Sequence, residues 1–245
     1  MEDKPTPTGT PDHRPFRPKN LTTNDIREGC IKLYGTDDVS TEICVVNEEL
    51  RQGLDFVEKY QKSITIFGSA RTPEGNKYYE KARRIAYRAA KELGYAVVTG
   101  GGPGIMEAGN RGAYEANGVS LGLSIQLPHE QMSNPYLTED IPFYFFFTRK
   151  TAMRYGSEVY IFFPGGFGTL DEMMETLTLV QTKKIAPVPV IMVGEEFWKP
   201  LDAFIKQDLT EEHMIGESDP SLYIITDDED KILDIIKNAP LRHDN

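Results

Sequence analysis

The chain has few basic residues and lacks any long apolar run. Its 245 residues include 27 lysines and arginines against 38 aspartates and glutamates, a formal net charge of −11. Broad electrostatic binding to nucleic acid needs a basic face, so this balance argues against a nucleic-acid partner. No apolar segment approaches the roughly 20 residues that cross a bilayer, which argues against a membrane partner. A small local anion-binding site is compatible with the negative net charge and with the lack of long apolar runs.

Cysteine, too, is scarce, and the N-terminus lacks the apolar core of a secretory signal. The opening MEDKPTPTGT has no apolar h-region. Cys30 and Cys44 fit neither a CxxC metal motif nor a dense disulfide framework. We therefore expect two ordinary thiols, a reducing compartment and a cytoplasmic protein.

Neither a metal site nor a pyridoxal site is evident. The four histidines form no HxxxH or Cys/His cluster of the kind that binds zinc. The chain has no His-Lys dipeptide, which often carries the Schiff-base lysine of pyridoxal enzymes. We expect no metal and no organic cofactor, and the composition disfavours a decarboxylase.

The chain divides into three parts. Residues 1–20 contain five prolines and few apolar side chains, which predicts a disordered tail or, alternatively, an arm that docks on a partner subunit. Residues 21–62 predict a helical extension, with one helix over 24–33 and another over 40–61, where apolar residues recur at spacings of three and four. Residues 63–245 form the predicted nucleotide-binding catalytic domain.

This third part alternates between apolar β-type runs and helical patterns. Nearly continuous apolar strands separated by helices indicate a parallel sheet covered on both faces. The predicted fold class is therefore α/β, a Rossmann-like doubly wound parallel sheet with a helical N-terminal extension. The predicted strands are 64–67, 96–99, 120–125, 143–147, 159–163, 188–193 and 222–225, and the predicted helices are 75–93, 104–117, 148–156, 169–182, 196–208 and 227–238.

Glycines cluster where three of these strands end. Gly68 follows the first strand, glycine-rich residues 100–104 follow the second, and residues 164–169 follow the fifth. Ligands of open α/β sheets bind outside the carboxyl ends of the strands. The sequence therefore predicts one crevice in which bare backbone faces a ligand.

The first glycine-rich segment is TGGGPGIMEA, residues 99–108. Glycine permits positive φ and close approach of a ligand, and the N-terminus of the following helix attracts phosphate. We expect Gly101, Gly102 and Gly104 to contact phosphate; the alternative is a tight turn without a ligand. The segment matches neither GxGxxG nor the Walker pattern, which argues against ATP hydrolysis.

The second segment is FPGGFGTLDE, residues 163–172, which again joins a strand to a helix. Glu172, in the first helical turn, would point toward a sugar. The alternative is that Thr169 and Glu172 merely form a capping box, because they have its T-x-x-E spacing. The phosphate-binding candidates here are Gly165, Gly166, Gly168 and the Thr169 hydroxyl.

Between the two segments, Thr148 is expected to cap a short helix with Arg149 and Lys150 in its first turn. Cations at the N-terminus of a helix are unfavourable because of the helix dipole, and a bound anion would offset that cost. The guanidinium of Arg149 is planar and bidentate, so it is the better ligand for a phosphate or carboxylate, and Lys150 is a further candidate for binding the phosphate. The alternative is a solvated surface pair.

Taken together, GGGPGIMEA, the RK pair and PGGFGTLDE resemble the LOG-type cytokinin riboside 5′-monophosphate phosphoribohydrolases, a family once described as lysine decarboxylases. The family pattern PGGxGTxxE is matched in full, and the resemblance covers about residues 62–210. It implies that Arg149 and Glu172 are the catalytic pair, that the glycine loops hold the 5′-phosphate, and that the protein is at least a dimer. The glycine motif and the N-terminal extension are closer to the longer-chain branch, so AMP (an AMP nucleosidase activity) is as good a candidate as the substrate of cytokinin biosynthesis.

Cleavage of an N-glycosidic bond develops oxocarbenium character on the ribose, which a nearby carboxylate stabilises while it orients or deprotonates water. We assign this role to Glu172, and substrate binding and stabilisation of the leaving base or phosphate to Arg149.

Two alternative functions remain open. One is a non-catalytic carrier or sensor of a nucleotide or of a pterin-type cofactor such as molybdenum cofactor; the other is an interaction protein that acts through its helical N-terminus.

Weaker signals surround this pair. Ser69 and Arg71 follow the first strand and are candidates for phosphate or ribose contact. Thr178 matches a substrate-contacting position of the family, with a packed helix threonine as the alternative. The candidates for base or ribose contact are Met106, Glu130 and Asn134, whose alternatives are core packing for the methionine and loop hydrogen bonding for the other two.

Overall fold

The computed structural model describes residues 22–35, 38–126 and 133–241. The proline-rich segment 1–20 and the candidate Glu130 lie outside the described residues. Within the described ranges, no helix is long and apolar enough to span a membrane.

Seven parallel strands form one sheet in the order β4-β3-β2-β1-β5-β6-β7. β1 lies at its centre: Ile64 is paired with Val97 of β2 on one side and with Val159 of β5 on the other. The chain thus winds outward from β1 to β4 and then returns to the opposite side of β1, which confirms the doubly wound α/β fold. The strands are β1 (Ser63–Phe67), β2 (Ala96–Thr99), β3 (Ser120–Ile125), β4 (Glu139–Phe143), β5 (Val159–Phe162), β6 (Val190–Met192) and β7 (Ile224–Ile225).

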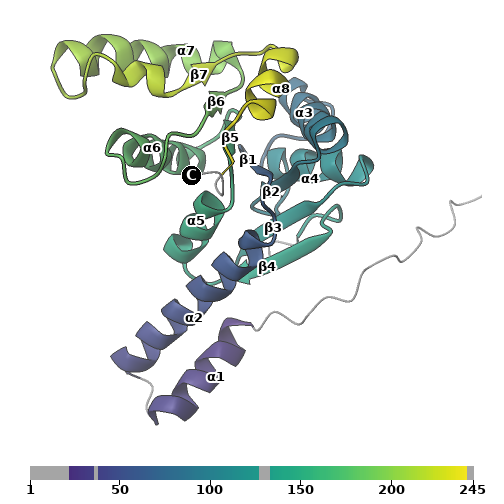
Figure 1. Ribbon diagram of the computed structural model, residues 1–245, viewed down its shortest axis with the longest axis vertical. Coiled ribbons are helices and arrows are strands. Elements are labelled where there is room, and N and C mark those ends of the chain that lie inside the picture. Colours follow the sequence, from purple (N-terminus) through teal and green to yellow (C-terminus); the bar gives the residue numbers. More distant parts are fainter. Residues whose placement is uncertain (1–21, 36–37, 127–132, 242–245) are drawn as a thin grey trace, which may run out of the picture.

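Helices cover both faces of this sheet, as Figure 1 shows. Successive strand residues point to opposite faces. Ile64 and Ile66 pack with α3, α4 and α8, whereas Phe67 packs with α2, α5, α6 and α7. The helices are α1 (Thr23–Tyr34), α2 (Val39–Glu58), α3 (Lys77–Leu93), α4 (Ile105–Glu115), α5 (Phe146–Tyr155), α6 (Phe167–Gln181), α7 (Glu195–Phe204) and α8 (Glu229–Lys237); a π-helical turn (Ile205–Leu209) and a 3-10 turn (Asp219–Leu222) complete the set.

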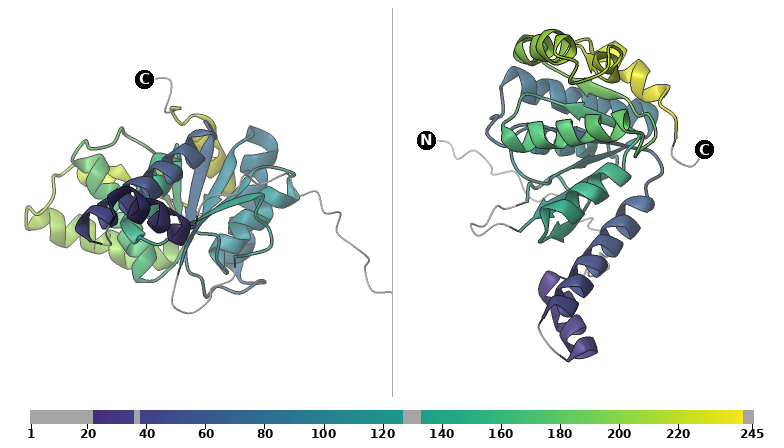
Figure 2. Two further views of the ribbon diagram at one scale, coloured as in Figure 1. Left: turned by 90° about the horizontal axis from the view of Figure 1, so that it is seen from below. Right: turned by 90° about the vertical axis from the view of Figure 1, so that its left-hand side faces the viewer.

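The N-terminal extension is a hairpin of α1 and α2 that projects from the body of the molecule (Figures 1 and 2). Thr22 and Asp25 form a capping box that starts α1, and the carboxylate of Asp38 caps α2. Toward its C-terminal end, α2 buries Phe56 and Val57 against the sheet. The hairpin also contacts the body nearer its middle, where Phe145 packs against Ile26, Cys30 and Val45.

The cysteines are not the two free thiols that the sequence predicted. Cys30 of α1 and Cys44 of α2 form a disulfide, with their Cα atoms 6.0 Å apart. A separation of 14 residues does not by itself predict that two cysteines pair. In the structure, α1 and α2 are neighbouring helices, and the two cysteines lie on the sides that face each other. The inference of a reducing compartment rested on free thiols and loses that support.

Reduction of this disulfide should destabilise the hairpin. By the chain-entropy relation, a cross-link over 14 residues removes unfolded-state freedom worth about 3 kcal/mol at most. We expect the paired variant Cys30→Ser/Cys44→Ser, or wild type in reductant, to melt at lower temperature and to lose amide protection in α1 first. Thiol titration of the oxidised, denatured protein should find no free thiol; two titratable thiols would contradict the pairing.

One predicted strand is displaced. The run 143–147 was expected to be a strand, but β4 ends at Phe143 and α5 begins at Phe146. The chain turns there because the backbone N–H groups of Tyr144 and Phe145 donate to a side chain of α2 rather than to a neighbouring strand. The N-cap of α5 is consequently Phe145, and Thr148 lies inside the helix instead of capping it.

Candidate active site

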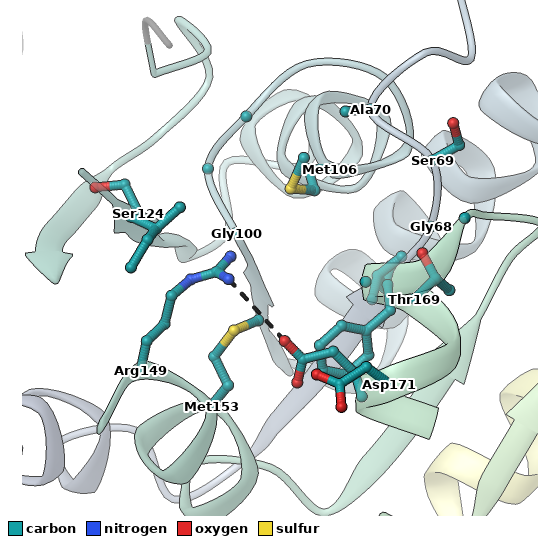
Figure 3. Close-up of a pocket in the computed structure, with 18 of the residues that line it drawn as sticks. Gly68, Ser69, Ala70, Gly100, Met106, Ser124, Arg149, Met153, Thr169 and Asp171 are labelled. Carbon is teal, nitrogen blue, oxygen red and sulfur yellow. Dashed lines mark ion pairs between the residues drawn. The ribbon is translucent and has the colours of Figure 1, made fainter. Parts of the chain in front are cut away.

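A pocket of about 710 Å³ opens where β2, β1 and β5 end (Figure 3). These three neighbouring strands carry the glycine-rich segments, so the predicted crevice is present. Its walls come from the ends of β1 and β3, the glycine turn after β2, and the first turns of α5 and α6. The winding direction reverses between β1 and β5, and doubly wound sheets bind ligands at such a switch point.

The glycine turn after β2 needs glycine for conformation and for space. Gly101 and Gly104 both have φ of +72°, where a side chain is strained. A Cβ at Gly104 would overlap the carbonyl oxygen of Ser69, and one at Gly100 would overlap the guanidinium of Arg149. Gly104 is also the N-cap of α4. The turn thus brings a helix N-terminus and bare backbone to the pocket edge.

Two buried asparagines hold this turn in place. The amide of Asn134 donates to the carbonyl of Gly102 at 3.0 Å and to Oδ1 of Asn110 at 2.9 Å. Asn110 also accepts a 2.5 Å bond from the hydroxyl of Thr99. Asn134 was predicted as a base or ribose contact; it is placed behind the turn, where it supports the backbone. Asn110 escaped sequence reasoning, since a single buried polar residue on a helix gives no distinctive pattern.

The segment after β5 places Thr169 and Glu172 inside a helix. α6 begins at Phe167, and its N-cap is Gly166. Because the helix starts before Thr169, the capping-box alternative for Thr169 and Glu172 is wrong. A Cβ at Gly165 would overlap the Thr169 side chain, so this glycine makes room for a threonine that is buried at the pocket wall.

Arg149 and Glu172 meet on the pocket floor. Nη1 of Arg149 lies 4.0 Å from Oε1 of Glu172, and their side chains are only 11% and 14% exposed. Nε of Arg149 donates to the carbonyl of Leu123 at 2.6 Å, which fixes the guanidinium from β3. The dashed line in Figure 3 marks the pair. At 4.0 Å the two groups attract each other without being tightly bonded, so substrate atoms can approach both.

Burial shifts the pKa values of both members. It raises the pKa of Glu172 from 4.5 to about 7, against the opposing attraction of Arg149 and Lys150 and with the help of Asp171 and Glu175. Burial lowers the pKa of Arg149, and Glu172 opposes that shift. A carboxyl that titrates near neutral pH in a cleft is suited to acid–base work.

Other predicted residues divide between the pocket wall and its surroundings. Lys150 lies in ion pairs with Asp171 and Glu175 at 2.7 and 2.8 Å, and the Thr178 hydroxyl donates to the Met174 carbonyl. Among the described residues, neither lines the pocket, nor do Gly104 and Gly165. The predicted residues that line it are Ser69, Arg71, Gly101, Gly102, Met106, Arg149, Gly166, Gly168, Thr169 and Glu172.

Several lining residues were missed by sequence reasoning. Met153 follows Arg149 by four residues, so the helical period placed both on one face of α5. Ser124 is at the carboxyl end of β3, which the strand-end rule alone would have flagged. The missed lining residues include Phe146, Met153, Ser124, Ile125 and Asp171.

Comparison with known proteins places this chain in a family. The family model described as possible lysine decarboxylase matches residues 106–236, more than half of the chain. The protein therefore belongs to this family, the LOG family of the resemblance above.

Two named relatives are similar to this chain at low identity. A cytokinin riboside 5′-monophosphate phosphoribohydrolase of Rhodococcoides fascians is 25% identical over 157 residues, which cover 61% of this chain and 77% of the relative. A probable enzyme of the same name from Oryza sativa subsp. japonica is 27% identical over 195 residues, covering 76% and 88%. The relatives support a hydrolase.

One solved structure confirms the fold. The crystal structure of TM1055 superposes with a TM-score of 0.54 at 22% identity and covers 72% of this chain and 98% of its own. The molybdenum cofactor binding protein of Rippkaea orientalis matches at a TM-score of 0.49 and 21% identity, covering 71% and 93%.

Proposed function

We propose that this protein hydrolyses the N-glycosidic bond of a purine or N6-substituted adenine nucleoside 5′-monophosphate. The products are the free base and ribose 5-phosphate. The observation that carries the proposal is the buried Arg149–Glu172 pair on the floor of a pocket whose rim is glycine backbone. The relatives named phosphoribohydrolases support the same reaction.

The phosphate belongs at the rim. The N-caps of α4 and α6 are Gly104 and Gly166, and the positive ends of the two helix dipoles favour an anion near the rim. Arg71 is exposed at the same rim and adds a positive charge. Binding energy gained on the phosphate positions the sugar over the floor of the pocket.

The reaction follows from what lies on that floor. As the C1′–N bond breaks, positive charge develops on the ribose, and the Glu172 carboxylate stabilises it. The base departs with the bonding electron pair and takes a proton from solvent. Glu172 accepts a proton from the water whose oxygen bonds to C1′ and afterwards releases it to solvent, which returns the carboxylate to its starting form. Arg149 stabilises negative charge on the departing base or on the phosphate.

We also propose that the protein acts as a homodimer or a higher homo-oligomer. Exposed aromatic side chains of α5 and α6 border the pocket mouth, with Phe146 57% and Phe167 93% exposed. Apolar surface of this kind is covered in assemblies. Sedimentation equilibrium would give the mass, and a monomer at micromolar concentration would contradict the proposal.

A panel of substrates tests the activity. Purified protein is incubated with AMP and with N6-isopentenyl-AMP, each beside its nucleoside, and free base and ribose 5-phosphate are quantified by chromatography. We expect cleavage of the monophosphates and little cleavage of the nucleosides. No cleavage of any nucleotide, together with tight binding of a nucleotide or of molybdenum cofactor, would favour the carrier instead. Tight partner binding that survives Glu172→Ala would favour the interaction protein.

Turnover should rise with pH through the titration of Glu172. The ionised carboxylate is the form that stabilises the ribose cation, and burial holds its pKa at about 7. Below that pH the group is protonated, so kcat should fall as pH drops from 8 to 6, by about tenfold for each pH unit well below the pKa. A kcat profile that is flat over this interval would contradict the role of an ionised Glu172.

A further inference from the structure

Glu49 of α2 is a buried acidic residue that reaches from the N-terminal extension to the start of α5. This side chain is 3% exposed although it is a carboxylate. It accepts hydrogen bonds from the backbone N–H of Tyr144 at 2.8 Å and of Phe145 at 3.1 Å. A third bond, of 2.5 Å, comes from the Thr148 hydroxyl. Burying an unpaired carboxylate would be costly, so these three hydrogen bonds are what allow Glu49 to be buried here.

All three donors lie at the start of α5. The N-cap residue Phe145 has no polar side chain, so the helix cannot be capped from its own chain in the usual way. Glu49 instead holds the N–H groups of the N-cap residue and of the residue before it, and it places a negative charge near the helix N-terminus, which the helix dipole favours. The chain that enters α5 is thus anchored by a residue 95 positions earlier.

The fit between α2 and α5 is close around this contact. Gly53 lies one helical turn after Glu49, and a Cβ there would come within 2.7 Å of Phe143 and 3.1 Å of Ala152 on α5. A Cβ at Gly156, just after α5, would come within 2.9 Å of Val57. Both ends of α5 are therefore fixed against the same face of α2.

Arg149 is in the first turn of the helix so fixed. Its backbone N–H bonds to the carbonyl of Phe145, one of the residues that Glu49 holds. Its guanidinium reaches from there to Leu123 and toward Glu172. A shift at the start of α5 would therefore displace the guanidinium relative to Glu172.

We propose that Glu49 is a positioning residue: from the N-terminal extension it fixes the start of α5 and so the direction in which Arg149 enters the pocket. This inference rests on the proposed function for its kinetic test. On this proposal the helical extension is part of the active-site framework, because its Glu49 anchors the chain that enters α5.

The variants Glu49→Gln and Glu49→Ala test this role. Gln keeps the shape but presents an N–H₂ group to one donor, and Ala removes every bond. We expect kcat to fall about tenfold for Gln and about 10²-fold for Ala, because misplacement near 1 Å costs about that much. KM should change less than about threefold, because the glycine rim still holds the phosphate. Glu48→Gln is the matched control: it is the neighbouring residue, it pairs with Arg51 on the surface, and we expect wild-type kcat.

The pH profile separates positioning from a loss of folded protein. The charged groups facing Glu172 are Arg149 and Lys150 from α5, and Asp171 and Glu175 from α6. If Arg149 moves away, the pKa of Glu172 rises and the acidic limb of kcat moves to higher pH. Partial unfolding would lower kcat equally at every pH. Loss of the negative charge of Glu49 with no movement of Arg149 would lower the pKa of Glu172. The acidic limb of the kcat profile would then move to lower pH, which is the opposite direction.

Titration of Glu172 by carbon NMR measures the direction of this pKa shift without any measurement of turnover. If Glu49→Ala does not fold, Thr148→Val removes one of the three bonds, and Thr148→Ser, which keeps the hydroxyl, should restore activity. Wild-type kcat with an unmoved limb in both Glu49→Gln and Thr148→Val would overturn the positioning role and leave the hydrolase intact. An inactive wild type would overturn the proposed hydrolase, and the NMR titration of the Glu49 and Thr148 variants would still decide the positioning role.

Discussion

Replacement of Glu172 by Gln should lower kcat by about 10²-fold or more at pH 8. Gln has nearly the same shape but cannot stabilise the ribose cation as an anion or accept the proton of water. Since the two helix N-termini and the glycine rim are untouched, KM should change little. Single-turnover release of free base from AMP measures the effect. Near-normal turnover would refute the acid–base role.

The same substitution should not weaken the fold. The pKa of Glu172 is raised to about 7 in the folded protein, so folding favours the protonated form. The stability contributed by this carboxyl is present below its unfolded pKa near 4.5 and is lost as pH rises through 7. Glu172→Gln should therefore melt at or above the wild-type temperature at pH 8. A lower melting temperature would show that the loss of activity has a structural cause.

Glu175→Gln is the matched control for Glu172→Gln. It makes the same chemical change three residues further along α6, in a side chain that pairs with Lys150 and Arg154. We expect turnover within a few-fold of wild type. Comparable losses of turnover in both variants would mean that turnover depends on the total negative charge of α6 rather than on the Glu172 carboxylate itself.

The sequence predicted the sheet, its winding and the strand ends that form the pocket. Those predictions depend on local patterns: apolar runs such as Val159–Phe162 are buried on both faces, and Gly101 and Gly104 occupy conformations that only glycine adopts easily. A local pattern of this kind is visible in one stretch of chain. The pocket therefore follows from the order of strands and glycines, and the Arg149–Glu172 pair from motif resemblance.

What escaped prediction depends on distant contacts. The start of α5 is decided by Glu49, and nothing in residues 143–148 indicates that a carboxylate of α2 will bind their backbone. The aromatic run there has high strand propensity, which the tertiary contact overrides. The Cys30–Cys44 disulfide likewise needs the hairpin to exist first. Asn134 was singled out for polarity in a loop, but only the fold shows that it supports Gly102.

Arg149→Met should lower kcat at pH 7 by about 10²-fold. The substitution removes the bond to the Leu123 carbonyl and the cation 4.0 Å from Glu172. Because Arg149 lowers the pKa of Glu172, its loss should raise that pKa above 7, so Glu172 is mostly protonated at neutral pH. Part of the activity should return at pH 9, where the carboxyl ionises; the remaining deficit measures what the guanidinium does for the leaving group.

Two further variants sharpen this result. Arg154→Met makes the same change five residues later on α5, in a side chain that pairs with Glu175 outside the pocket, and should keep wild-type kcat and pH dependence. Arg149→Lys keeps the charge but not the planar fork, so its acidic limb should stay nearer wild type while kcat still falls. If Arg149→Met leaves the acidic limb unmoved, then Arg149 does not tune Glu172. In that case burial and the charges of Lys150, Asp171 and Glu175 would set the pKa of Glu172 and the pH dependence of turnover.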